Sequence, residues 1–170
     1  LAADHLKLCA HELGSISERR TATLVDGHMS EGLPPYLAPV PAHHSGFMLP
    51  QYAAAAIVSE NKVLCHPASA DSIPTGANIE DHVSMGTVAA RNAMTVADNV
   101  TTVLAIECLA AAQAVELRAR KPSPRSAAAI AVIRGAVPFR RVDREWGDAL
   151  ERMRARISDG SLVRAALGPA

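Results

Sequence analysis

The pattern of apolar and polar residues along this chain of 170 residues predicts helices, and no segment shows the alternation typical of a strand. Between residues 1 and 26, apolar side chains recur at spacings of three and four, which is the period of one helix face. These positions are Leu6, Cys9, Leu13 and Ile16. Gly27 follows as a stop signal, so we expect a first helix over residues 1–26.

A second helix is predicted from residue 46 to about residue 64. Pro50 falls in its first turn, where the missing N–H does no harm, and Pro67 follows its end. Clusters of glycine, proline and polar residues predict loops at 27–45 and at 67–79.

The longest helical stretch begins near residues 80–84 and can continue to residue 118. A continuous helix from 86 to 118 would be about 50 Å long. A compact domain of this size has a diameter of about 40 Å. Such a helix would protrude unless neighbouring chains cover it, although the polar cluster at 97–102 can kink it.

Beyond this stretch, shorter helices are predicted at 125–136 and 143–157, followed by a short helix or a frayed tail. The sequence therefore predicts an all-α protein built on a long-helix bundle. We divide it into a helical-bundle segment with loops, residues 1–120, and a segment of short helices, residues 121–170.

The composition limits both the partners and the core. Seventeen basic residues balance seventeen acidic ones, so charge gives no reason to expect nucleic acid or an anionic membrane as a partner. Apolar residues make up 49% of the chain, but aromatic residues only 3%. Alanine favours helix, yet each alanine buries little area. Such a core fits a multi-helix assembly better than an isolated domain.

Neither a membrane span nor secretion is predicted. The longest apolar run, Val103 to Val115, is interrupted by Glu107 and Gln113 and is shorter than the roughly 20 residues that span a bilayer. The first residues lack the apolar region of a secretory signal. Three widely spaced cysteines fit neither a disulfide framework nor a zinc knuckle. We therefore expect a cytoplasmic protein.

The segment Glu80-Asp81-His82 places three ionisable residues at the expected start of the long helix, where the helix dipole favours ionised carboxylates. From the residues alone, two interpretations stay open. Asp81 can simply cap the helix while His82 bonds a buried backbone group, or the segment can belong to an active site.

Two other positions could carry chemistry. The pair His43-His44 has no third ligand at a spacing typical of zinc, so no metal site is expected. Met48 stands at the start of the second predicted helix. It can pack in the core, the usual role of a methionine on a helix, or line a pocket.

Four segments together resemble a known family. They are the stretch from Ser45 to Gly86, ELGSISERR at 12–20, GLPPYLAP at 32–39 and VLAIECLAAAQAVELR at 103–118. They are similar to the C-terminal half of the histidine and aromatic amino-acid ammonia-lyases. The resemblance implies that the long-helix bundle forms the C-terminal part of the ammonia-lyase fold.

The resemblance also implies two site residues. Glu80 stands where the histidine lyases place a catalytic glutamate that contacts the bound amino acid, whereas phenylalanine and tyrosine lyases usually carry glutamine there. Met48 stands where histidine lyases place a methionine that faces the substrate ring. The chain departs from the histidine lyases at Ile79, where glutamine is usual, and at Gly76, where serine is usual.

The family's electrophile is a methylidene-imidazolone (MIO) made from an internal Ala-Ser-Gly, and these 170 residues contain no such tripeptide. The resemblance therefore implies that the N-terminal portion of the same enzyme, or a complementary chain, supplies the MIO within a tetrameric homo- or hetero-oligomer. We expect the assembly to eliminate ammonia from L-histidine to give urocanate, and this chain alone to be inactive.

Two alternatives stay open at this point. One is an ammonia-lyase or 2,3-aminomutase that acts on tyrosine or phenylalanine, a reading that the departure at Ile79 favours. The other is a non-catalytic helical assembly module that shares the scaffold, a reading that the missing Ala-Ser-Gly favours and the retained Glu80 opposes.

Overall fold

The computed structural model describes residues 1–40 and 43–168, so residues 41–42 of the predicted first loop and the last two residues of the predicted tail lie outside it. Within these ranges the chain is helical, with no strand beyond an isolated bridge between Thr75 and Glu80. The helices are α1 (Ala2–Val25), α2 (Met48–Leu64), α3 (Gly86–Leu117), α4 (Pro124–Ala136), α5 (Gly147–Ser158) and α6 (Ser161–Leu167). The all-α prediction is confirmed.

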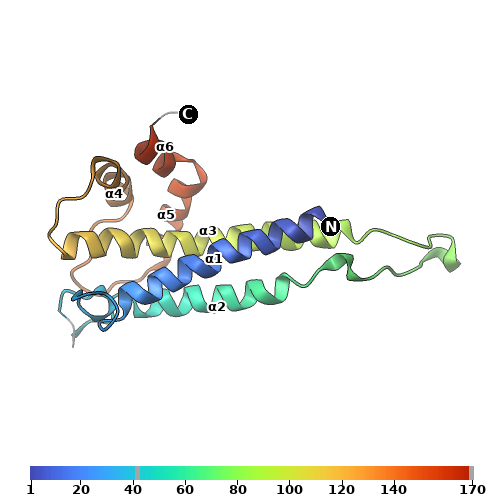
Figure 1. The fold of residues 1–170 in the computed structure, drawn as a ribbon, viewed down its shortest axis with the longest axis horizontal. Helices are drawn as coiled ribbons and strands as arrows, with labels where there is room; N and C mark the ends of the chain where they lie inside the picture. The colour runs from blue at the N-terminus through green and yellow to red at the C-terminus, as the bar shows by residue number, and fades with distance from the viewer. Residues whose placement is uncertain (41–42, 169–170) are drawn as a thin grey trace.

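The three longest helices lie side by side in an elongated bundle (Figure 1). α1 and α3 run in the same direction, and α2 runs antiparallel to both. The helices α4, α5 and α6 form a cluster against the C-terminal half of α3, and the loop that joins α2 to α3 extends beyond the other end of the bundle (Figure 1). The bundle therefore has two distant ends, each with its own loop.

α3 is one continuous helix of 32 residues, without a break at the polar cluster 97–102. At 1.5 Å per residue it is about 48 Å long. It begins at Gly86 rather than near residues 80–84, because hydrogen bonds hold the preceding segment extended. The Ser72 hydroxyl donates to the Val83 carbonyl (3.1 Å) and accepts the Val83 N–H (2.9 Å).

By length and composition alone, α3 could cross a membrane. The helix meets this test although Glu107 and Gln113 interrupt the apolar run at 103–115. Half of the qualifying stretch is buried inside the protein. α1, α2, α4 and α5 all pack against α3, so within this structure it is the core helix of the bundle.

The face of α1 that meets the rest of the bundle is largely polar. Its buried positions are Asp4, Lys7, Gly14, Ser17, Glu18, Thr21 and Val25. The apolar stripe that predicted this helix points outward instead, with Leu6 63% exposed and Leu13 62% exposed. The helix prediction is confirmed in its bounds, and the structure leaves its apolar face uncovered.

α5 begins later than predicted, at Gly147 rather than at residue 143. Residues 137–146 instead form a linker that returns from α4 to the loop before α2. Its residue Val137 is buried, and Trp146 packs against the same cluster of apolar side chains as α5. The linker also carries Asp143, which bonds the turn before α2.

α1 packs tightly against α3 at Gly14. A Cβ placed on Gly14 would lie 3.1 Å from Val100 Cγ2, so the two helices leave no room for a larger side chain. Gly14→Leu should therefore push the helices apart and lower the free energy of unfolding by about 1–3 kcal/mol.

Urea denaturation checks this prediction, with Gly135→Leu as the control. A Cβ at Gly135 meets no atom within 4 Å, so that variant should be close to neutral. Because leucine favours helix more than glycine, propensity would stabilise both variants, so equal destabilisation of both would contradict the account of a steric cost at the α1–α3 contact.

Candidate functional site

Met48 is the first residue of α2 and is half-buried. The turn before it is fixed by backbone hydrogen bonds: the Phe47 N–H donates to the Tyr36 carbonyl (2.9 Å), and the Met48 N–H donates to the Ser45 carbonyl (3.0 Å). Gly46 has φ +50°, and a Cβ there would lie 2.4 Å from the Tyr36 oxygen. Only glycine fits this turn, which fixes where α2 starts.

A carboxylate from the C-terminal segment holds the same turn. Asp143 accepts the N–H groups of Ser45 (2.6 Å) and Gly46 (2.9 Å). These bonds, the Ser45 one most, lower the pKa of the Asp143 carboxyl. His44 Nδ1 lies 4.0 Å from the same carboxylate. The start of α2 is therefore tied to the linker between α4 and α5.

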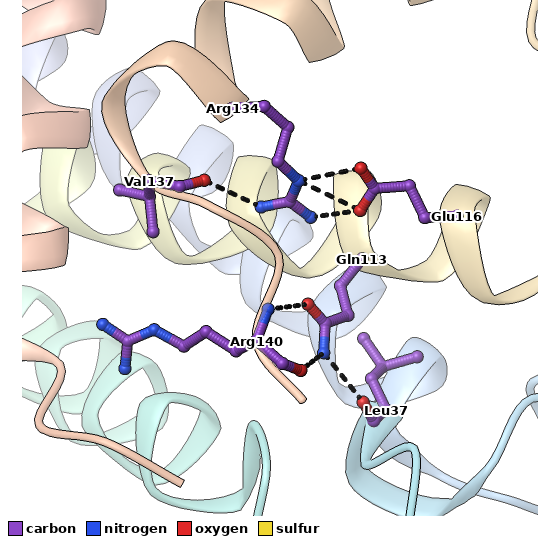
Figure 2. A network of polar contacts seen from close by, with 6 residues as sticks. All are labelled: Leu37, Gln113, Glu116, Arg134, Val137 and Arg140. Carbon is purple, nitrogen blue, oxygen red and sulfur yellow. Dashed lines mark hydrogen bonds and ion pairs between the residues drawn. The ribbon is translucent and has the colours of Figure 1, made fainter. Parts of the chain in front are cut away.

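The buried side chain of Gln113 on α3 supports that linker (Figure 2). Its Nε2 donates to the carbonyls of Leu37 (3.1 Å) and Arg140 (2.9 Å), so one amide bridges the loop before α2 and the linker. Beside it, Arg134 forms an ion pair with Glu116 at 2.6 Å (Figure 2). All these groups meet at the C-terminal half of α3.

Glu80 lies at the opposite end of the bundle, in the extended loop between α2 and α3. Its backbone forms the bridge to Thr75, with hydrogen bonds of 3.0 and 3.3 Å. Its carboxylate folds over Gly76, where a Cβ would lie 2.1 Å from Glu80 Oε2. Glu80 is exposed, and its neighbour Ile79 is 85% exposed. Within the described residues, the Glu80 side chain has no hydrogen-bond partner.

The base of this loop is fastened to α1. Asp4 accepts the N–H groups of Ala68 (3.1 Å) and Ser69 (3.0 Å), while Lys7 donates to the His66 carbonyl (2.7 Å). Asp4 and Lys7 also form an ion pair at 2.8 Å, and both are almost fully buried. The bond from Lys7, followed by that from Ser69, holds the pKa of the Asp4 carboxyl well below its usual range.

The structure does not bring the two predicted site residues together. Met48 begins α2, and Glu80 lies beyond the end of that helix. α2 has 17 residues and is therefore about 25 Å long. No substrate the size of an amino acid can contact both residues of one chain. Nor do the described residues contain a group of three His, Cys, Asp or Glu side chains that could hold a metal ion.

Comparison with known proteins decides the family. Residues 1–135 match the family model described as aromatic amino acid lyase. The chain belongs to the aromatic amino acid lyase family.

Relatives within this family are similar along nearly the whole chain. A histidine ammonia-lyase of Aromatoleum aromaticum is 51% identical over 164 residues, which are 96% of this chain and 31% of that protein. The crystal structure of a histidine ammonia-lyase from Trypanosoma cruzi superposes with a TM-score of 0.90 at 40% identity, covering 96% of this chain and 33% of that one. This chain thus spans about a third of the length of these relatives.

An aminomutase shares the fold equally well. The structure of a tyrosine aminomutase from Streptomyces globisporus superposes with a TM-score of 0.93 at 40% identity, again over 96% of this chain and 32% of the other. The predicted family is therefore confirmed, as is the expectation that the chain matches part of the ammonia-lyase fold. The shared fold alone does not separate the two reactions.

Sequence reasoning missed the residues that hold the two loops of this lyase-family chain. Asp143 is 98 residues away from Ser45, and no local pattern marks such a partner. Asp4 and Lys7 were visible only as polar residues of a helix. Their spacing of three residues puts them on one face, but nothing in the sequence shows that this face is buried.

Asp4→Asn should lower the free energy of unfolding at neutral pH, because it leaves Lys7 buried without its counter-charge. The pKa of Asp4 lies below its ordinary value of 3.8 in the folded protein. The stabilisation by the ionised Asp4 carboxylate is therefore complete at pH values above the ordinary pKa of 3.8. It is lost as the pH falls toward the lower pKa of the folded protein.

Denaturation from neutral pH down to about pH 3 should show the difference between wild type and Asp4→Asn narrowing below about pH 4. Asp71→Asn is the control, because Asp71 is exposed in the same loop. A difference that stays constant at low pH would contradict the role of the ionised carboxylate.

Proposed function

We propose that this chain is part of an ammonia-lyase that converts L-histidine to urocanate and ammonia. The observation that carries the proposal is a carboxylate at position 80, presented on an extended loop whose base is fastened by Asp4 and Lys7. The histidine ammonia-lyases that match the chain at about half identity support the choice of histidine.

Glu80 suits the chemistry of this substrate. A carboxylate can accept hydrogen bonds from the ammonium group or from the imidazole N–H, and it can take up a proton. An amide at the same position could not act as a base at neutral pH. Glu80 and Ile79 are exposed in this chain. We propose that another chain covers their loop when the enzyme assembles, which would bring Glu80 to the substrate.

We propose that each active site combines Glu80 of one subunit with Met48 of another. The length of α2 keeps the two residues of one chain apart, so a site with both needs at least two chains. The uncovered apolar stripe of α1, which includes Leu6 and Leu13, supports burial of the bundle in such an assembly. Met48 would contact the substrate ring, and Glu80 would contact its polar groups.

The electrophile cannot come from these residues. MIO forms from Ala-Ser-Gly, and no such tripeptide occurs in the 170 residues. We propose that the rest of the protein, or a complementary chain, supplies it, and that this chain alone is inactive. When present, the group provides the electrophilic centre of the lyase reaction. The residues described here would bind and orient the amino acid beside it.

Two observations favour a second candidate, a tyrosine or phenylalanine ammonia-lyase or 2,3-aminomutase. The tyrosine aminomutase of Streptomyces globisporus is as similar in structure as the histidine lyase. Ile79 also places an apolar side chain next to Glu80, where an amide could have bonded a polar ring. A non-catalytic assembly module has no such support beyond the missing tripeptide.

Glu80→Gln in the full-length protein should reduce histidine turnover by about 10²–10⁴-fold, because the variant loses the basic oxygen. Ultraviolet absorbance of urocanate gives the rate, and tyrosine and phenylalanine are offered in parallel. Asp81→Asn is the matched control, since it removes a neighbouring exposed carboxylate.

Unchanged histidine turnover in Glu80→Gln would remove Glu80 from the reaction. Wild-type turnover of tyrosine or phenylalanine, without turnover of histidine, would favour the second candidate. No turnover of any of the three by the assembled protein would support the non-catalytic module.

A further inference from the structure

The linker between α4 and α5, residues 137–146, is braced by contacts between its own residues, made by Arg140. Arg140 Nη1 donates to the carbonyls of Arg144 and Glu145, both at 2.9 Å. The Arg140 guanidinium also lies over the Trp146 ring, 4.1 Å from its centroid. Asp143 sits between these anchor points. Its carboxylate is therefore carried by a segment that has internal contacts of its own.

Two contacts join the braced linker to the start of α2. Asp143 accepts the consecutive N–H groups of Ser45 and Gly46 with its two oxygens, at 2.6 and 2.9 Å. Three residues further on, Trp146 packs its ring against Phe47, with centroids 4.5 Å apart. Phe47 is 2% exposed. A polar and an apolar contact thus fix three residues in succession, directly before Met48.

The two N–H groups of Ser45 and Gly46 favour a carboxylate at position 143. Each of the two N–H groups has its own acceptor oxygen on Asp143, and a charged acceptor strengthens both bonds. Asparagine offers only one oxygen and would turn its NH₂ group toward an N–H donor. Gln113 donates to the Arg140 carbonyl and accepts the Arg140 N–H at 3.4 Å, so the linker cannot easily follow a displaced turn.

We propose that Asp143 is a positioning residue for substrate binding: it fixes the turn from Ser45 to Phe47 and thereby the side chain of Met48 at the substrate ring. This inference rests on the proposed function, in which Met48 lines the site. Because Met48 would contact the ring in the ground state and in the transition state alike, loss of its position weakens binding more than it slows the chemical step.

The first experiment does not depend on activity. Hydrogen exchange, followed by mass spectrometry, is measured on the full-length protein and on Asp143→Asn. The peptide that contains Ser45, Gly46 and Phe47 should exchange about tenfold faster in the variant, because a charge-assisted bond is lost. Unchanged exchange there would overturn the inference.

The second experiment measures KM and kcat for histidine. Asp143→Asn should raise KM about tenfold and change kcat less than about twofold. In the Met48→Ala background the same change should raise KM less than about twofold, because the residue through which Asp143 acts is already gone. A simple structural role predicts effects that multiply, and that result would overturn the inference.

Asp159→Asn is the matched control. Asp159 accepts the Ser161 N–H (2.7 Å) beside α6, so the variant removes the same charge and the same kind of bond away from α2. It should leave KM and the exchange at Ser45 unchanged. If the assembled wild type turns over no histidine while exchange still rises in Asp143→Asn, the proposed function fails and the contact itself stands. If wild type is active and Asp143→Asn has a normal KM, the positioning role fails alone.

Discussion

The structure depends on one interaction that occurs at both ends of the bundle: an aspartate that accepts two consecutive backbone N–H groups. At one end Asp4 holds Ala68 and Ser69, and at the other end Asp143 holds Ser45 and Gly46. A carboxylate with two such donors makes strong, directional bonds and remains ionised at neutral pH. In each case a carboxylate on a helix or on the linker positions a loop through the loop's own backbone.

The helices between these two ends act as spacers. α2 is fixed at its start by the turn that Asp143 holds, and at its end by the contacts of Asp4 and Lys7. The close approach of α1 and α3 at Gly14 keeps the bundle narrow. The two loops are therefore held apart at a distance set by helix length. This geometry supports the proposal that each active site combines loops from different chains.

Helix positions were predictable because they depend on local signals. Glycine and proline marked most ends, and the period of the apolar residues marked α1. The start of α3 was predicted too early, because the hydrogen bonds between Ser72 and Val83 that keep the loop extended join residues 11 apart. The outward apolar face of α1 could not be foreseen, because periodicity shows that a face exists but not what covers it.

The candidate site was predictable only in part. The resemblance pointed to Glu80 and Met48, and their roles stay predictions. It did not show that α2 separates them, since distance in space follows from the fold and not from the spacing of motifs. Asp143 lies outside the matched residues 1–135 and carries no signal of its own. Long-range contacts between a side chain and the backbone leave no periodic trace in one sequence.

The central claim is that Glu80 and Met48 of one chain serve different active sites. Coexpression of the full-length protein carrying Glu80→Gln with the same protein carrying Met48→Lys tests it most directly. Each variant alone should be inactive on histidine. Mixed assemblies should regain about a quarter of the wild-type sites, because some sites then receive both native residues from different chains. Mixed assemblies that stay inactive, although both variants are present in one oligomer, would contradict the claim.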